Sequence, residues 1–268
     1  MLLTIAVLGA GMIGGALIKS LLKSGYEGAV IATRRHVEKL AELEKLGATV
    51  TSDNRMAAEK ADVIVLCVKP KDVEKVLTEI KGKADGKLVI SFAAAIGLNL
   101  LKRVAPEARF VRAMPNLAIL VQESFTAYCA DSDVTPEDKG KADEIMGRLG
   151  TVIEIEEGHM DAITALSGCA PAYLSVVLEA LTYAGLEAGL PKDVSLLSAA
   201  QSMVGTGRLV LEAGKHPAEI RHMVTTPGGV TIEGLKELEK FPIRHAFLMA
   251  VKAATEKSMR ISKALCKS

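Results

Sequence analysis

The segment Gly9-Ala10-Gly11-Met12-Ile13-Gly14 limits the fold of this chain more tightly than any other part of its sequence. It has the form G-x-G-x-x-G, a pattern found in the turn between the first strand and the first helix of dinucleotide-binding domains. Here it follows the aliphatic run 4–9 and opens the amphipathic stretch 12–24, and a second aliphatic run occupies 29–33. This order of strand, glycine turn, helix and strand is the context in which the pattern predicts a bound dinucleotide.

Each glycine of the segment has a separate task in such a site. Gly9 permits the tight turn, Gly11 lets the backbone approach a pyrophosphate, and Gly14 lets the helix pack closely against the strand. The free N–H groups at the start of the helix, at Met12 and Ile13, then face the phosphates. A glycine-rich turn without a ligand is the alternative, but the flanking strands and helix favour the dinucleotide.

The end of the second predicted strand distinguishes between the two nicotinamide dinucleotides. NAD-binding domains usually place Asp or Glu there, about 20 residues beyond the glycines, to bind the ribose hydroxyls. This chain has Thr33-Arg34-Arg35 instead, and no carboxylate occurs before Glu38. Because a planar guanidinium matches a phosphate bidentately, Arg34 and Arg35 favour NADP(H), with NAD(H) as a secondary cofactor. The alternative is that both arginines are solvated surface residues.

Short aliphatic runs alternate with amphipathic stretches through the first half of the chain. Strands are predicted at 4–9, 29–33, 62–68, 88–92 and 109–112, and helices at 12–24, 37–46, 71–80 and 98–104. This alternation predicts an α/β, Rossmann-like domain with a mostly parallel sheet covered on both faces. Residues 124–130 and 151–155, with a helix after Thr135-Pro136-Glu137, are expected to extend that sheet.

The strand-like runs stop after Gly158, and the rest of the chain is predicted to be all-helical. Helices are expected at 161–189, interrupted near Pro171, and at 192–213, 217–223, 231–239 and 243–264. We therefore predict two domains, 1–158 and 159–268. The second is so apolar, above all at 174–186 and 196–211, that it is expected to bury surface against another subunit.

Composition excludes several functional classes. Lys and Arg number 33 against 32 Asp and Glu, so there is no basic field for nucleic acid, and only 3% of residues are aromatic. The uncharged run 162–178 is shorter than the ~20 residues that span a bilayer, and the uncharged residues 1–18 lack the basic start of a signal peptide, so no membrane segment is expected. Four dispersed cysteines without a CxxC pair indicate no disulfide scaffold and no metal site, and favour the cytoplasm.

Two blocks in the second half of the chain are distinctive. Residues 165–173 read Ala-Leu-Ser-Gly-Cys-Ala-Pro-Ala-Tyr, and residues 223–232, which follow His216-Pro217, read Met-Val-Thr-Thr-Pro-Gly-Gly-Val-Thr-Ile. They resemble the signatures of pyrroline-5-carboxylate reductase, and Val68-Lys69-Pro70 and 111–116 resemble further blocks of that family in the same order. The resemblance covers essentially the whole chain. It implies a dinucleotide-binding domain followed by an all-helical dimerisation domain, with higher oligomers built from dimers.

The reaction implied by the resemblance is the NAD(P)H-dependent reduction of 1-pyrroline-5-carboxylate to L-proline, the last step of proline biosynthesis. Hydride passes to the carbon of a cyclic C=N bond, and an iminium accepts it readily, so positioning supplies much of the rate. This agrees with a sequence in which no His/Asp pair stands out. The histidines at 159, 216, 222 and 245 are expected to be surface or capping residues.

The resemblance also implies roles for individual residues. Thr231 would be catalytic, through a hydrogen bond to the ring nitrogen of the substrate. Glycine N–H groups ahead of a helix suit a substrate carboxylate. The substrate-binding candidates are Ser167, Thr226, Gly228, Gly229, Val230 and Thr231, and the further cofactor-binding candidates are Val68, Lys69, Pro70 and Asn116. Ser167 and Thr231 are also candidate N-caps, and Lys69 as a solvated lysine is an alternative.

Some positions depart from the family pattern. Cys169 and Ala170 stand where the family has Ser and Gly, Leu117 stands in place of Thr, and Thr226 in place of Ser. These changes are compatible with hydride transfer, but they leave more than one imine as the candidate substrate. The alternatives are a related imine or ketimine reductase and, from another class, a non-catalytic NADP-binding redox sensor. A β-hydroxyacid dehydrogenase would carry a proton-donating lysine in the helical domain, and Lys192 at a helix start does not fit that role.

Overall fold

The computed structural model of the chain describes residues 2–267, whose contacts divide it into two compact units. The sheet unit holds the residues up to Ala170 and those from Ala253 onward, and the helical unit holds Pro171–Lys252. Met160 and the partly buried Leu265 pack into a hydrophobic cluster of the sheet unit, which is why segments on both sides of the helical unit belong with the sheet. The predicted domain boundary between residues 158 and 159 stays a prediction. The two compact units are defined by contacts within the chain, and the first segment of the sheet unit ends at Ala170.

Eight strands form one sheet, in the order β3-β2-β1-β4-β5-β6-β7-β8. They are β1 (Ile5–Leu8), β2 (Val30–Thr33), β3 (Thr49–Thr51), β4 (Val63–Leu66), β5 (Leu88–Ser91), β6 (Arg109–Met114), β7 (Ser124–Ala130) and β8 (Gly150–Glu154). Neighbouring strands run parallel throughout, except that β6 and β7 are antiparallel. The prediction of a mostly parallel sheet is therefore confirmed. The strand order reverses between β1 and β4, and in such sheets ligands bind at the carboxyl ends of these strands.

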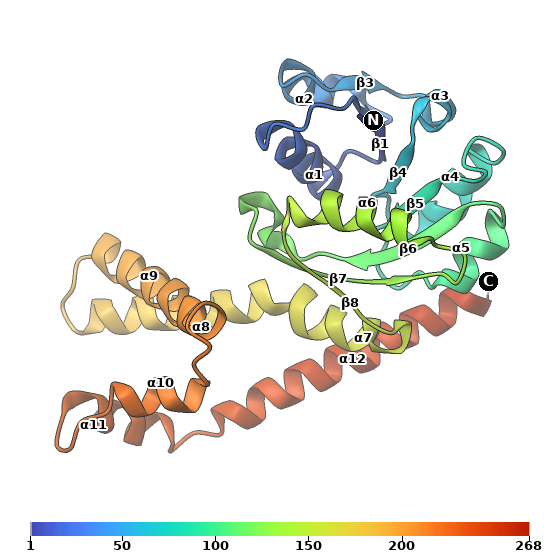
Figure 1. Cartoon of the computed structure of the whole chain (residues 1–268). Coiled ribbons are helices and arrows are strands. Elements are labelled where there is room, and N and C mark those ends of the chain that lie inside the picture. The colour runs from blue at the N-terminus through green and yellow to red at the C-terminus, as the bar shows by residue number, and fades with distance from the viewer. Residues whose placement is uncertain (1, 268) are drawn as a thin grey trace. The chain divides into compact units, whose positions relative to one another are not determined.

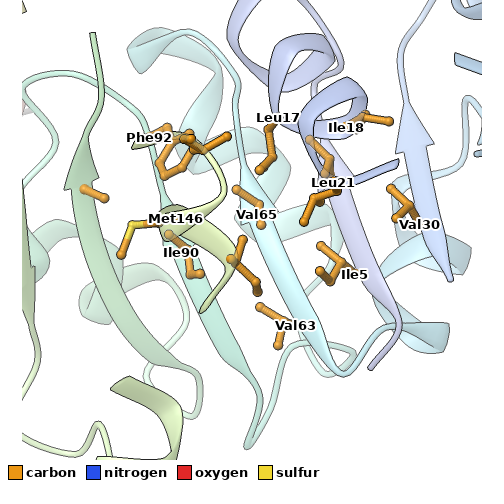
Figure 2. Close-up of a cluster of buried hydrophobic side chains, with 14 of the residues drawn as sticks. Ile5, Leu17, Ile18, Leu21, Val30, Val63, Val65, Ile90, Phe92 and Met146 are labelled. Carbon is orange, nitrogen blue, oxygen red and sulfur yellow. The ribbon is translucent and has the colours of Figure 1, made fainter. Parts of the chain in front are cut away.

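Helices and helical turns cover the sheet. They are α1 (Met12–Lys23), η1 (Val37–Leu40), α2 (Ala41–Lys45), α3 (Asn54–Lys60), η2 (Pro70–Asp72), α4 (Val73–Glu79), α5 (Leu98–Val104), η3 (Leu117–Val121) and α6 (Pro136–Gly147). Alternate residues of β1 enter two separate cores, Ile5 on one face and Leu8 on the other. Figure 2 shows the first core, where Leu17 and Leu21 of α1 lie over Val65 of β4. Burial on both faces explains why the strands read as unbroken aliphatic runs.

The sequence reading misses β3 and α3. β3 is three residues long at one edge of the sheet, with Thr49 exposed, so it lacks the aliphatic run that marks the inner strands. α3 does carry a local signal, because the carboxylate of Asp53 accepts a hydrogen bond from the N–H of Met56, 2.9 Å away, as an N-cap. An Asp three residues before a short alanine-rich stretch is too common a pattern to predict a helix by itself.

The remainder of the chain is helical, as predicted (Figure 1, yellow to red). The elements are η4 (Glu157–His159), α7 (Met160–Ile163), the π-helical turn η5 (Thr164–Gly168), α8 (Ala170–Glu187), α9 (Lys192–Leu211), α10 (Pro217–Met223), α11 (Val230–Leu238) and α12 (Ile243–Lys267). The predicted interruption near Pro171 is this π turn, and Pro171 itself lies in the first turn of α8, where its missing N–H is tolerated. His216 caps α10, its Nδ1 accepting from the N–H of Ala218.

The predicted N-cap roles of Ser167 and Thr231 are wrong. Ser167 lies inside η5, where the chain is already helical, so it cannot cap a helix start. Gly229 is the N-cap of α11 and Val230 its first residue, which places Thr231 second in that helix. The hydroxyl of Thr231 is therefore not required for capping, which leaves it available for another task.

The long helices of the helical unit expose apolar side chains. Exposed positions include Val176 and Tyr183 on α8 and Leu197 and Leu211 on α9, with Leu211 at 81%. By length and composition alone, the helical stretch Glu157–Glu187 could cross a membrane. Only 11% of its most apolar 18-residue segment is buried. A single chain thus leaves its most apolar helical surface open.

Candidate active site

A cleft of about 410 Å³ lies at the carboxyl ends of β1, β2 and β4, where the strand order reverses. Its lining residues are Gly9, Gly11, Thr33, Arg34, Arg35, His36, Asn54, Cys67, Val68, Lys69, Lys71, Asp72 and Val76. The structure thus brings two of the predicted glycines together with both arginines and with the loop after β4. Pro70, the first residue of η2, is not itself a lining residue but lies in the chain between two that are, Lys69 and Lys71, and Lys69 is exposed.

The three glycines of the turn differ in what they contact. Gly9 has a φ of +94°, and a Cβ there would lie 2.7 Å from Cγ1 of Val68 and 2.9 Å from the carbonyl oxygen of Cys67. A Cβ on Gly14 would lie 2.6 Å from the carbonyl oxygen of Gly9. A Cβ on Gly11 would meet nothing closer than 4.0 Å. Packing therefore requires glycine at the first and third positions, and space for a ligand accounts for Gly11.

The N-terminus of α1 is open to an anion. Gly11, the N-cap, provides no side-chain cap, and the first turn contains no acidic residue. The first N–H groups of a helix lack partners within it and carry the positive end of the helix dipole. The backbone at Met12 and Ile13 is therefore suited to the pyrophosphate of a dinucleotide.

Thr33, at the end of β2, braces the glycine turn. Its Oγ1 accepts a hydrogen bond from the N–H of Gly9 at 3.3 Å and donates to Oδ1 of Asn54 at 2.6 Å. Nδ2 of Asn54 in turn donates to Glu79 at 3.0 Å. The hydroxyl of this buried threonine is thus directed to protein partners. Asn54, which lines the cleft, is not among the residues predicted from the sequence, because α3 itself is not predicted.

The two arginines have different partners. Nη1 of Arg34 donates to the carbonyl oxygen of Ala10 at 3.4 Å, whereas Nη2 of Arg35 lies 3.3 Å from Oδ1 of Asp72. Lys69 and Lys71 add positive charge to the same lining. This excess of cations fits the phosphates of NADP(H).

Cys67 is one of the residues that line the cleft, and burial raises the pKa of its thiol well above the ordinary value. The thiol is therefore neutral at physiological pH, adds no negative charge beside the phosphates, and is not an activated nucleophile. No group of three or more His, Cys, Asp or Glu side chains in the described part of the chain is placed to hold a metal ion.

A second hollow, of about 300 Å³, lies at the carboxyl ends of β5 and β6. It is lined by Ile13, Phe92, Ala94, Met114, Pro115, Asn116, Leu117 and Gly168. Most of these side chains are apolar, and the amide of Asn116 is the polar contribution. Its Nδ2 donates to Oγ of Ser167 at 3.3 Å, and its Oδ1 accepts from the N–H of Ala118 at 3.0 Å. Two predicted site residues, 51 positions apart, therefore meet at this hollow.

The other predicted substrate-binding residues belong to the helical unit. The turn before α11 is closed by a hydrogen bond from the N–H of Gly229 to the carbonyl oxygen of Thr226, 3.0 Å long, with Gly228 at a φ of +67°. As in α1, the first turn of α11 has no side-chain cap. Val230 is exposed and Thr231 is half-buried. The turn thus offers backbone N–H groups and one hydroxyl.

Known proteins place this arrangement in one family. The model of the pyrroline-5-carboxylate reductase dimerisation domain matches residues 157–261, and that of the coenzyme F420-dependent NADP oxidoreductases matches residues 4–95. A pyrroline-5-carboxylate reductase of Methanosarcina acetivorans is 37% identical, over 97% of this chain and 98% of that protein.

Two solved structures agree with this relationship over nearly the whole chain. A pyrroline-5-carboxylate reductase of Coxiella burnetii has a TM-score of 0.92 at 34% identity, covering 97% of this chain and 99% of that one. The Plasmodium falciparum enzyme, solved with NADP bound, has a TM-score of 0.87 at 30% identity, with 97% and 98% covered. Relatives this similar over their full length, together with the dimerisation domain of its second half, show that the chain belongs to the pyrroline-5-carboxylate reductase family.

Proposed function

We propose that the protein reduces 1-pyrroline-5-carboxylate to L-proline and takes the hydride from NADPH. Full-length identity of 34–37% to curated reductases carries this assignment. The cleft independently supports NADPH as the cofactor, since it combines the glycine turn with two arginines and no carboxylate at the end of β2. The comparisons give no support to the alternative of a redox sensor or a reductase of another imine.

NADPH supplies the hydride, and residues of this chain bind and orient NADPH. The open N-terminus of α1, at Gly11, Met12 and Ile13, holds the pyrophosphate. Arg34 and Arg35 bind the 2′-phosphate, which distinguishes NADPH from NADH. Lys69 contributes positive charge from the loop after β4.

The hollow beside Asn116 is suited to the nicotinamide ring. Its apolar wall, with Phe92 and Met114, excludes water and packs against a flat ring, while the Asn116 amide can hydrogen-bond a carboxamide. Because Asn116 is held by Ser167 and by the N–H of Ala118, its side chain has a fixed orientation. A fixed ring is what hydride transfer by positioning requires.

The turn Thr226–Thr231 binds the substrate. The N–H groups of the first turn of α11, beginning with that of Val230, hold its carboxylate, and no dedicated arginine is needed. When hydride reaches the carbon of the C=N bond, the electron pair of that bond moves to nitrogen, and the Thr231 hydroxyl donates a hydrogen bond to the developing lone pair. The proton of the iminium stays on nitrogen, and the new lone pair takes up a second proton from the solvent, which gives L-proline as its zwitterion. Ser167, a substrate-binding candidate of the sheet unit, offers a further hydroxyl, whose oxygen accepts a hydrogen bond from Asn116.

The domain at residues 157–261 is one of dimerisation, so the chain associates with a second copy. Assembly of such dimers into larger oligomers is part of the proposal, as is a location in the cytoplasm. Cys67, Cys129 and Cys169 are free thiols, which supports a reducing compartment. The side chain of Cys266 lies outside the described part of the chain.

An assay of NADPH oxidation with 1-pyrroline-5-carboxylate, run beside other cyclic imines, tests the proposal. We expect this substrate to have the highest kcat/KM of the panel. Faster turnover of a different imine would show that the substrate differs from that of the family, and would attribute this difference to the departures at Cys169, Ala170 and Leu117. NADPH binding without oxidation of NADPH by any imine would favour the redox sensor.

A further inference from the structure

Asp72 is the one carboxylate among the described residues that line the cofactor cleft. The other charged lining residues are cations, at Arg34, Arg35, Lys69 and Lys71. A carboxylate in a cleft that binds phosphates weakens the binding of NADPH more than that of NADH, because NADPH carries the additional 2′-phosphate. The contacts of Asp72 show what this carboxylate does in the cleft.

The carboxylate of Asp72 is not needed to build its own helix. Asp72 occupies the N-cap position of α4, where an Asp side chain ordinarily accepts from the backbone, yet it makes no capping hydrogen bond. Its Oδ1 instead lies 3.3 Å from Nη2 of Arg35, across 37 residues of sequence. The side chain of Asp72 is 23% exposed and that of Arg35 is 79% exposed, so the carboxylate is the fixed partner and the guanidinium the movable one.

Only one of the two phosphate-binding arginines is held in this way. Arg34 donates to a neutral carbonyl oxygen, that of Ala10, and lies only partly exposed against the glycine turn. Arg34 is therefore available to a 2′-phosphate without breaking an ion pair, whereas Arg35 must first exchange Asp72 for the phosphate.

We propose that Asp72 is a specificity-determining residue, which narrows the preference for NADPH over NADH by competing with the 2′-phosphate for Arg35. This deepens the proposed function and rests on it. With NADH, which lacks the phosphate, Arg35 stays paired with Asp72 and nothing is lost. With NADPH, the ion pair between Arg35 and Asp72 must be broken, and the free energy that this costs offsets part of the binding free energy contributed by the 2′-phosphate. The carboxylate therefore lowers NADPH affinity and leaves NADH affinity nearly unchanged.

Equilibrium binding of NADPH and NADH by titration calorimetry, on the full-length protein, tests this inference without reference to turnover. The Asp72→Asn variant is expected to bind NADPH about 2- to 5-fold more tightly, the range of an exposed ion pair that no longer has to be broken. Its Kd for NADH should change by less than about twofold, since that ligand has no group that exchanges with Asp72. Should Asp72→Asn not fold, Asp72→Ser removes the same charge and supports a helix start.

Two further variants locate the effect. Glu74→Gln removes one negative charge from the same helix at an exposed residue outside the cleft lining, and it should leave both Kd values unchanged. In an Arg35→Ala background, the gain from Asp72→Asn should vanish. Equal Kd values for NADPH in wild type and Asp72→Asn would overturn the inference, and so would a gain that persists without Arg35. Failure of the proposed function would show earlier, as a wild-type protein that does not bind NADPH.

Discussion

A Cβ atom on Gly9 would lie 2.7 Å from Cγ1 of Val68, because the turn that follows β1 packs directly against the end of β4. The same contact places the backbone of the glycine turn beside the loop that begins at Val68, and both line the cofactor cleft. The first glycine is thus part of the fold, whereas Gly11, two residues later, borders open space. Protein packing and ligand binding therefore make separable demands on one short segment.

Alanine at Gly9 should mainly lower the stability of the protein, whereas alanine at Gly11 should mainly weaken the binding of NADPH. Gly9→Ala requires a left-handed alanine and an overlap with Val68, so we expect a loss of about 2–5 kcal/mol in the free energy of unfolding. Gly11→Ala should leave stability within about 0.5 kcal/mol of wild type and weaken NADPH binding by about tenfold or more, as the added methyl group meets the pyrophosphate. Thermal melting and NADPH titration measure both. A Gly11→Ala variant with normal NADPH affinity would contradict the position assigned to the pyrophosphate.

Cofactor choice should reside in Arg34 and Arg35. Replacing both by alanine removes charge-assisted hydrogen bonds worth about 1.5–3 kcal/mol, so the KM for NADPH should rise roughly ten- to a hundredfold. The KM for NADH should change far less, because NADH has no 2′-phosphate. Steady-state kinetics with each cofactor at saturating substrate measures this. Equal effects on the two cofactors would show that these arginines do not bind the 2′-phosphate.

Thr231 should matter for turnover and not for folding. Thr231→Val keeps the shape of the side chain but removes a hydrogen bond that forms partly in the transition state, so kcat should fall about five- to a hundredfold. The KM for NADPH and the melting temperature should stay near wild type, since Gly229 and not Thr231 is the N-cap of α11. Melting curves and steady-state kinetics on this variant are the measurements. A destabilised protein with wild-type turnover would refute the catalytic role.

The helical unit should be stable only as a dimer. Large apolar side chains such as Val176, Tyr183 and Leu197 are exposed in the single chain, and the family match assigns them to a dimerisation domain. Burial of such a surface against a second copy is the ordinary way to remove it from water. Light scattering at micromolar concentration should find dimers or multiples of dimers. A stable monomer at that concentration would contradict the prediction.

Much of the fold is predictable from local patterns of the sequence. The strands β1, β2, β4 and β5 read as aliphatic runs because both faces of the sheet are covered, whereas β6 also contains Arg109 and Arg112. The amphipathic stretches between them supply the covering helices, and the stretch 37–46 forms both η1 and α2. β3 is missed because an edge strand of three residues, Thr49–Thr51, buries too little to leave a pattern. α3 is missed because its N-cap, Asp53, is too common a signal to predict a helix by itself. The assignment of Thr231 as an N-cap is wrong because α11 begins at Val230, with Gly229 at the N-cap position, and sequence alone cannot choose between adjacent starts.

The candidate site is predictable where a motif carries it and unpredictable where tertiary contacts do. The glycine turn and the two arginines follow from local residue types and their spacing. Asn54 and Asp72 do not, because their roles arise from partners 21 and 37 residues away, at Thr33 and Arg35. The contact between Asn116 and Ser167 likewise joins positions that only the folded chain brings together.

Transfer of label from NADPH to product tests the central claim most directly. NADPH carrying deuterium at the transferred position of nicotinamide C4 is incubated with the protein and 1-pyrroline-5-carboxylate, and proline is analysed by mass spectrometry. The account predicts L-proline that carries one deuterium, on the ring carbon that formed the C=N bond, in an amount equal to the NADPH consumed. NADPH that binds but yields no labelled proline would contradict it.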